Sequence, residues 1–218
     1  LMKSVISNIV KYLLKEYPHK TELSASRLTK MIYLMDWKSA IDHGRQITDA
    51  KWHFNHYGPY VDDFVKLARD DKEISVENTA NFYGGRKQLF KLSSSYKGSI
   101  ELTEEQKKIA DFVIDATKQK NYEDFIQLVY STFPVISNDR YSDLDLVDSA
   151  TRYKALLANS SNKSRKADVL TPAASFSVRH LVWTLIKWLV KSLRNCERER
   201  QQAKMDRSTV IATGRCEI

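Results

Sequence analysis

The pattern of hydrophobic and polar positions is clearest between residues 28 and 64. Hydrophobic side chains recur every three or four positions from 28 to 41, which predicts a helix with about half of its surface buried. Gly44 follows where a helix commonly ends in a residue of positive φ. The hydrophobic positions of this helix are Leu28, Met31, Ile32, Tyr33, Leu34, Met35, Trp37 and Ile41.

An aromatic-rich segment comes next and ends in Gly58-Pro59. Trp52, Phe54 and His56 alternate with polar residues, and this period of two predicts a strand. A glycine can turn sharply, and a proline suits the first position of a helix. We therefore expect a turn at Gly58 and a new helix that begins at Pro59.

The other periodic segments predict a mostly helical, α+β body with a small β element. Thr103-Glu104-Glu105-Gln106 is a capping-box pattern that marks the start of one helix. Alternation on both sides of Gly84-Gly85 predicts a two-stranded ribbon. The expected helices cover 5–17, 59–69, 103–116, 121–133 and 144–157, and the ribbon covers 74–92.

The composition changes after residue 158. Residues 159–175 are rich in serine and asparagine, which predicts a linker. Residues 176–193 carry many large hydrophobic side chains but include Lys187, which is typical of an amphipathic helix and not of a bilayer span. We therefore expect a body over 1–158, a linker over 159–175, and a basic amphipathic helix with a polar tail over 176–218.

The net charge of +8 is unevenly distributed. Residues 161–218 hold 12 Lys and Arg against 5 Asp and Glu, whereas residues 1–160 hold 23 against 22. A basic protein as a whole suggests a nucleic-acid partner. A neutral body with a basic appendage suggests instead that the appendage has a partner of its own.

The cysteines and the N-terminal segment indicate a cytoplasmic protein. The two cysteines, Cys196 and Cys216, form no disulfide framework, so a reducing compartment fits best. Lys11, Lys15 and Glu16 interrupt the apolar N-terminal segment. We expect that segment to be a helix of the fold and not a signal peptide.

No complete catalytic set is evident, so we expect a binding protein and not an enzyme, with neither a metal nor a cofactor. His53 and His56 are three apart, and side chains with that spacing in a strand point to opposite faces. Asp49-Ala50-Lys51 could end a nuclease site, but such a site needs a second carboxylate on a preceding strand. The sequence contains neither a Gly-x-x-x-x-Gly-Lys phosphate loop nor a Gly-x-Ser-x-Gly nucleophile motif. A metal-dependent enzyme is the least favoured alternative.

Two groups of side chains are candidate partner-binding residues. Lys30, Tyr33 and Trp37 share one helix face. They form either a half-buried stripe from which Lys30 reaches water or the border of a functional groove. Trp183 and Trp188 lie in a broad apolar stripe of 176–193, which packs on the body, binds a partner or lies on a membrane surface.

These motifs together resemble the Panacea domain, a family that includes SocA-like proteins and many bacterial and phage antitoxins. The resemblance rests on Lys30-Met31-Ile32-Tyr33-Leu34, Trp37, Gly44 and Tyr57-Gly58-Pro59-Tyr60. It extends from about Val5 to Leu157. Met31 stands where the family usually has leucine, a swap that conserves volume in a core.

The resemblance implies an antitoxin that neutralises a cognate protein toxin by direct binding. Some SocA-like members also deliver the toxin to a protease, so a protease-chaperone is a second expected partner. The alternative is a nucleic-acid-binding regulator that uses the basic tail, with weak contacts; a membrane-surface contact of 176–193 is not favoured. The expected partner-binding residues are Lys30, Tyr33, Trp37, His56, Gly58, Pro59, Trp183 and Trp188.

Overall fold

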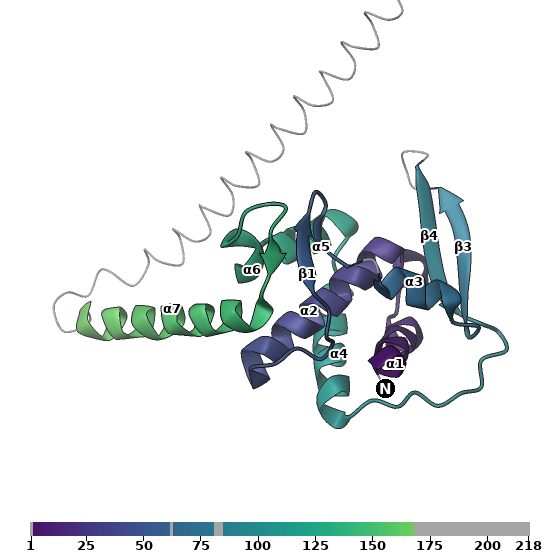
Figure 1. Ribbon diagram of the computed structural model, residues 1–218, viewed down its shortest axis with the longest axis horizontal. Helices are drawn as coiled ribbons and strands as arrows, with labels where there is room; N and C mark the ends of the chain where they lie inside the picture. The colour runs from purple at the N-terminus through teal and green to yellow at the C-terminus, as the bar shows by residue number, and fades with distance from the viewer. Residues whose placement is uncertain (1, 62, 81–84, 168–218) are drawn as a thin grey trace, which may run out of the picture. The chain divides into compact units, whose positions relative to one another are not determined.

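The computed structural model describes residues 2–61, 63–80 and 85–167, and its elements alternate between helices and short strands (Figure 1). The contacts within the chain divide it into two units, Leu1–Ala158 and Asn159–Ile218. The helices are α1 (Met2–Glu16), η1 (Lys20–Glu22, a 3₁₀ turn), α2 (Ala25–His43), α3 (Asp63–Asp70), α4 (Glu104–Thr117), α5 (Tyr122–Tyr130), α6 (Phe133–Ile136) and α7 (Leu146–Ala167). The strands are β1 (Trp52–Asn55), β2 (Gly58–Tyr60), β3 (Ile74–Ala80), β4 (Arg86–Leu92) and β5 (Asp143–Leu144).

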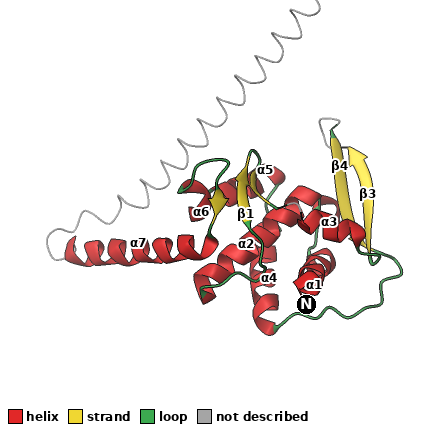
Figure 2. Cartoon of the chain, in the orientation of Figure 1, coloured by secondary structure: helices red, strands yellow, loops and turns green. Residues whose placement is uncertain are grey.

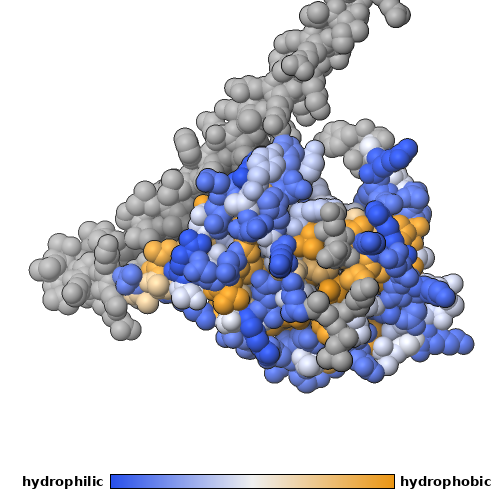
Figure 3. Space-filling view, viewed as in Figure 1, coloured by the Kyte–Doolittle hydropathy of each residue, from blue (hydrophilic) through white to orange (hydrophobic). Residues whose placement is uncertain are grey.

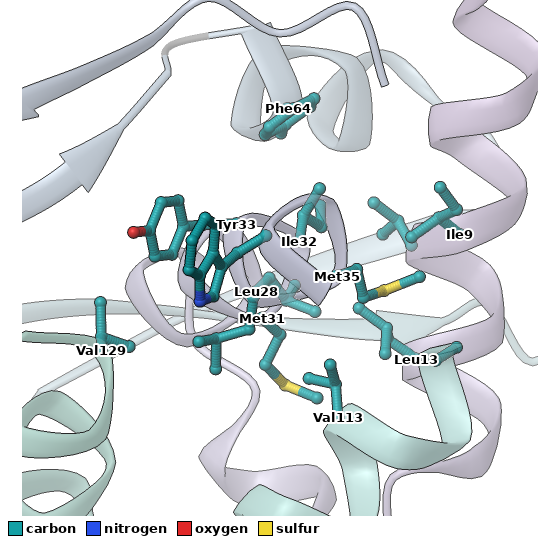
Figure 4. Close-up of a cluster of buried hydrophobic side chains, with 14 of the residues drawn as sticks. Ile9, Leu13, Leu28, Met31, Ile32, Tyr33, Met35, Phe64, Val113 and Val129 are labelled. Atoms are coloured by element: carbon teal, nitrogen blue, oxygen red, sulfur yellow. The ribbon is translucent and has the colours of Figure 1, made fainter. Parts of the chain in front are cut away.

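The first unit is organised around α2, which is buried along most of its length. The Ser24 hydroxyl caps its first turn by accepting from Arg27 N, and Gly44 ends it at a φ of 68° as predicted. Helices α1, α3 and α4 and strands β2 and β4 contact it. Figure 4 shows Met31, Ile32 and Met35 of this helix among side chains from the surrounding helices. Each such side chain contributes about 1.5–3 kcal/mol when it is removed from water.

The strands form two separate antiparallel sheets (Figure 2). Strands β3 and β4 pair from Ile74–Leu92 to Ala80–Arg86, which confirms the predicted ribbon. The other sheet has the order β2-β1-β5, and the sequence did not predict its third strand. The mostly helical α+β fold class is confirmed in the described residues.

Three predicted elements differ from the structure. Pro59 does not begin a helix: Gly58–Tyr60 is an edge strand, where a proline can stand without breaking the sheet, and α3 begins at Asp63. The helix predicted over 121–133 ends at Tyr130, and Pro134 lies in the first turn of the separate helix α6. Helix α7 continues to Ala167, into the predicted linker. The division of the chain into a body, a linker and an extension stays a prediction, because 168–218 lies outside the described residues.

A buried carboxylate connects α2 to the first strand of the three-stranded sheet. Asp36 Oδ1 accepts hydrogen bonds from the backbone N–H groups of Ile47 and Thr48, each at 2.9 Å. Its Oδ2 accepts from the Thr48 hydroxyl and, at 2.9 Å, from Trp52 Nε1. The Trp52 ring then packs edge-on against Tyr33, with 5.3 Å between the ring centroids. Asp36 thus fixes both the loop after α2 and the start of β1.

The first prediction concerns this carboxylate. Burial raises the pKa of Asp36 to about 6, although four hydrogen bonds act to lower it. Since the folded-state pKa lies above the unfolded value, the folded state binds more protons between pH 4 and 6, and stability falls as pH rises through that window. Relative to Asp36→Asn, which does not titrate, the wild-type free energy of unfolding should fall by about 2 kcal/mol from pH 4 to pH 6 and become level above about pH 7.

Urea denaturation followed by circular dichroism at several pH values measures this difference. The opposite slope, with the wild type gaining stability as pH rises towards 4, would contradict the prediction. It would mean that the four donors hold the pKa of Asp36 below its ordinary value.

Candidate functional site

The turn between β1 and β2 presents two aromatic side chains to solvent. Asn55 pairs with Gly58, so His56 and Tyr57 form a two-residue hairpin turn. The Asn55 side-chain oxygen accepts from the His56 backbone N–H at 2.6 Å and stiffens the turn. Tyr57 is 76% exposed, and its ring lies edge-on to His56 with 4.6 Å between the ring centroids. The hairpin therefore displays a large aromatic surface on a short, defined turn.

A distant segment adds a third aromatic ring beside this turn. Tyr141 N donates to Phe54 O at 2.6 Å, and Phe54 N donates to Ser142 O at 2.8 Å, so the segment is fastened to β1. The Tyr141 hydroxyl lies 3.2 Å from His56 Nδ1, while the ring is 62% exposed. We name His56, Tyr57 and Tyr141 the aromatic tip.

Tyr141 is held in a strained backbone conformation. Its φ is 67°, and within 2–61, 63–80 and 85–167 no other non-glycine residue has a positive φ. This region costs a side-chain-bearing residue on the order of 1–3 kcal/mol and is concentrated at functional sites. An exposed tyrosine has no packing need for such a backbone, so the strain marks this position as a candidate for binding.

Buried residues support the tip from below. Gly58 has a φ of 96°, and a Cβ added there would lie 3.2 Å from the Tyr130 ring. The Tyr130 ring also packs edge-on against Phe54, with 6.0 Å between the ring centroids. Gly58 thus serves both the turn and the close approach of Tyr130, and Pro59 is buried beside it.

The predicted residues Tyr33 and Trp37 lie in the interior. The Tyr33 hydroxyl is 2.7 Å from Thr132 Oγ1, and burial raises the pKa of this phenol above its ordinary value. The Trp37 ring packs against Tyr153 of α7, with 5.8 Å between the ring centroids. Both residues therefore connect α2 to other segments of the domain, and they do not form part of the aromatic tip.

Lys30 is also buried, at 3% exposure, so the interpretation in which it reaches water is wrong. Its ammonium donates to Ser26 Oγ at 3.2 Å. In the described part of the chain, no carboxylate oxygen lies within 4.0 Å of Lys30 Nζ. Burial lowers the pKa of Lys30 to about 8. A buried ammonium without a counter-ion is costly, and this makes Lys30 a candidate functional group.

The predicted set is thus divided between two places. His56, Gly58 and Pro59 lie at or directly under the aromatic tip, whereas Lys30, Tyr33 and Trp37 lie in the interior. Trp183 and Trp188 lie outside the described residues. The role of these eight residues in partner binding stays a prediction.

Sequence reasoning missed Tyr141 and Asp36 as important residues. Tyr141 belongs to a polar loop without any periodic signal, and only the folded chain brings it to His56. Asp36 lies among the buried positions of α2, where an acidic residue directly before Trp37 could have been noted. His53, considered for metal binding, lies 2.9 Å from Asp143 Oδ1 through its Nδ1.

Two further features of the described residues bear on the function. Among the described residues, no three His, Cys, Asp or Glu side chains gather in a way that could hold a metal ion. None of the helices in that same part of the chain has the length and hydrophobicity needed to cross a bilayer. Figure 3 shows hydrophobic residues at the surface over α7, where Val147, Leu156 and Leu157 are exposed.

The first unit is therefore a mostly helical domain with small antiparallel sheets that displays aromatic side chains on a hairpin turn. Residues 28–133 match the model of the family described as "Antitoxin SocA-like, Panacea domain", so this part of the chain is similar to that family. The match includes α2 and the hairpin turn, whereas Tyr141 lies beyond its end. No curated protein and no solved structure matched the chain.

The second prediction concerns Gly58. Gly58→Ala should lower the free energy of unfolding by about 2–4 kcal/mol, because the new Cβ meets the Tyr130 ring in addition to the cost of the positive φ. Gly44→Ala is the matched control: its φ is 68°, and nothing lies within 4 Å of the added Cβ, so only about 1–2 kcal/mol is expected. The free energy of unfolding of both variants is measured by chemical denaturation. An equal decrease in the two variants would show that the Tyr130 ring moves away from the new Cβ without a cost in stability.

Proposed function

We propose that this protein is an antitoxin that neutralises a cognate protein toxin by direct binding, and that the aromatic tip supplies the main contact. The match of residues 28–133 to the SocA-like antitoxin family supports the antitoxin role. The observation that carries the site is the strained, exposed Tyr141 beside His56 and Tyr57. Tyrosine offers a large contact area at a low cost in side-chain entropy, and aromatic residues commonly anchor interfaces.

The tip is suited to a preorganised interface. The hairpin turn, the two hydrogen bonds between Phe54 and residues 141–142, and the Tyr130 ring hold the aromatic rings before a partner arrives. Less conformational freedom then remains to be lost on binding, which favours affinity. The interior residues Tyr33 and Trp37 contribute by positioning, since they connect α2 to Thr132 and to α7.

Two further roles, delivery of the toxin to a protease and binding of nucleic acid, are secondary proposals. Delivery of the bound toxin to a protease would begin with the same binding step. A nucleic-acid-binding role for 161–218 is supported by its 12 basic against 5 acidic residues. Such binding would weaken steeply with salt, because phosphate contacts release counterions, and this dependence distinguishes it from contacts made by an uncharged aromatic surface.

The third prediction tests the tip with a variant that spares the fold. Asparagine tolerates a positive φ, so Tyr141→Asn should keep or raise the stability while it removes the ring. We expect this variant to bind the toxin at least about tenfold more weakly, as is typical for the loss of an interface aromatic. The toxin is first to be identified by expressing the products of neighbouring reading frames alone and testing for growth arrest; binding is then measured by calorimetry and neutralisation by co-expression.

Phe112→Ala is the control for this experiment. Phe112 is an exposed aromatic residue on α4 that stacks with Lys38, outside the tip. Its removal should leave toxin binding unchanged. If Tyr141→Asn and Tyr57→Ser both neutralise as well as the wild type, the tip is not the contact.

The fourth prediction concerns 176–193. In the full chain, Trp183→Ala combined with Trp188→Ala should weaken neutralisation, because large aromatic side chains in an extension beyond the family domain are suited to partner choice. The thermal unfolding of the domain serves as the control and should not change. Unaltered growth rescue by the double variant would remove these residues from neutralisation.

A further inference from the structure

The first turns of α2 and α5 meet above the buried ammonium of Lys30. Ser26 lies in the first turn of α2, and its hydroxyl is 2.8 Å from the hydroxyl of Tyr122, the first residue of α5. Lys30 Nζ donates to the same Ser26 hydroxyl from below, at 3.2 Å. The positive ends of two helix dipoles therefore meet beside two hydroxyl groups and a cation.

The charged groups around Lys30 leave its ammonium without a counter-ion. The neighbouring Arg27 is occupied by Glu22, at 3.2 Å, and by the Tyr17 hydroxyl, at 2.8 Å. Glu123 and Asp124 lie in the first turn of α5, but among the described residues no ion pair joins either of them to Lys30. The lowered pKa of Lys30 has burial as its cause, with no compensating charge.

We propose that Ser26, Lys30 and Tyr122 form a carboxylate-binding site that receives an acidic side chain of the toxin. This inference rests on the proposed antitoxin function and names the chemistry of one contact. A carboxylate would supply the missing counter-charge and accept hydrogen bonds from the ammonium and both hydroxyl groups. Within the residues that the structure describes, these donors are not matched by an acidic partner.

Tyr122 lies beside Ser26 at the surface, with 51% of the residue exposed. In the proposed site its ring rotates into solvent at the cost of the hydrogen bond to Ser26 and of the ring contact with Phe125. That rotation opens the path to Lys30, whose own side chain is buried. In the free domain, the buried Lys30 ammonium lowers the stability because it has no counter-ion. The same ammonium is available to bind a carboxylate of a partner.

Proton uptake on binding is the property that a merely structural lysine would not have. When a carboxylate reaches Lys30, the pKa returns towards its ordinary value of 10.5 from about 8. At pH 8, formation of the toxin complex should therefore take up about half a proton. Calorimetry in two buffers of different ionisation enthalpy measures this uptake.

The test uses Lys30→Met in the full chain with the toxin identified above. We expect the loss of the proton uptake and an affinity at least about 30-fold lower, while the thermal stability of the free protein stays equal or rises. Lys38→Met is the matched control, because Lys38 lies on the same helix but pairs with Asp42. It should keep both the affinity and the uptake.

The outcomes separate this inference from the proposed function. Tight binding by Lys30→Met with unchanged proton uptake would overturn the carboxylate site and leave the antitoxin role intact. If the toxin does not bind the wild type, the probe is sodium acetate, with sodium chloride as the salt control. A Lys30 pKa that rises with acetate in NMR titrations would then support the site, and an unchanged pKa would overturn it.

Discussion

The buried carboxylate of Asp36 is the interaction on which the arrangement of the site depends. Without this carboxylate, the backbone N–H groups of Ile47 and Thr48, the Thr48 hydroxyl and the Trp52 indole would each lose their acceptor. Because Trp52 opens β1, this contact sets the position from which the hairpin extends towards His56 and Tyr57. The aromatic tip is thus anchored to the central helix by one side chain of that helix.

Each of the two candidate binding sites contains a residue that departs from the usual rules of stability. Tyr141 has a backbone that favours glycine or asparagine, and Lys30 holds an ammonium away from water and from carboxylates of the described residues. Other positions follow those rules: Gly44 and Thr103 cap their helices, and Lys11 is paired with Asp71 and Glu73. Exceptions in a locally consistent protein are expected at functional sites.

Elements that depend on neighbouring residues could be predicted from the sequence. Features that depend on contacts between distant segments could not. The stripe of α2, its glycine end, the capping box at Thr103 and the β3–β4 ribbon all follow from neighbouring residues. Pro59 was assigned to a helix because its local preference fits one, but pairing with Phe54 at a sheet edge prevails. The contact between His56 and Tyr141 joins residues 85 positions apart, so no local pattern could reveal this half of the site.

Helix α5 connects the two candidate sites. Tyr130 at its end supports Gly58 and Phe54 under the aromatic tip, and Tyr122 at its beginning contacts Ser26, to which Lys30 donates. Tyr122 and Tyr130 are eight residues apart, and that length of helix spans roughly 12 Å. An interface of standard size, about 800 Å² per partner, is wider than this distance. Under the proposed function, one toxin surface can therefore contact the aromatic tip and place a carboxylate at Lys30. In such a complex the tip supplies apolar area and Lys30 supplies selectivity, because a partner without the acidic group would leave the ammonium buried and unpaired.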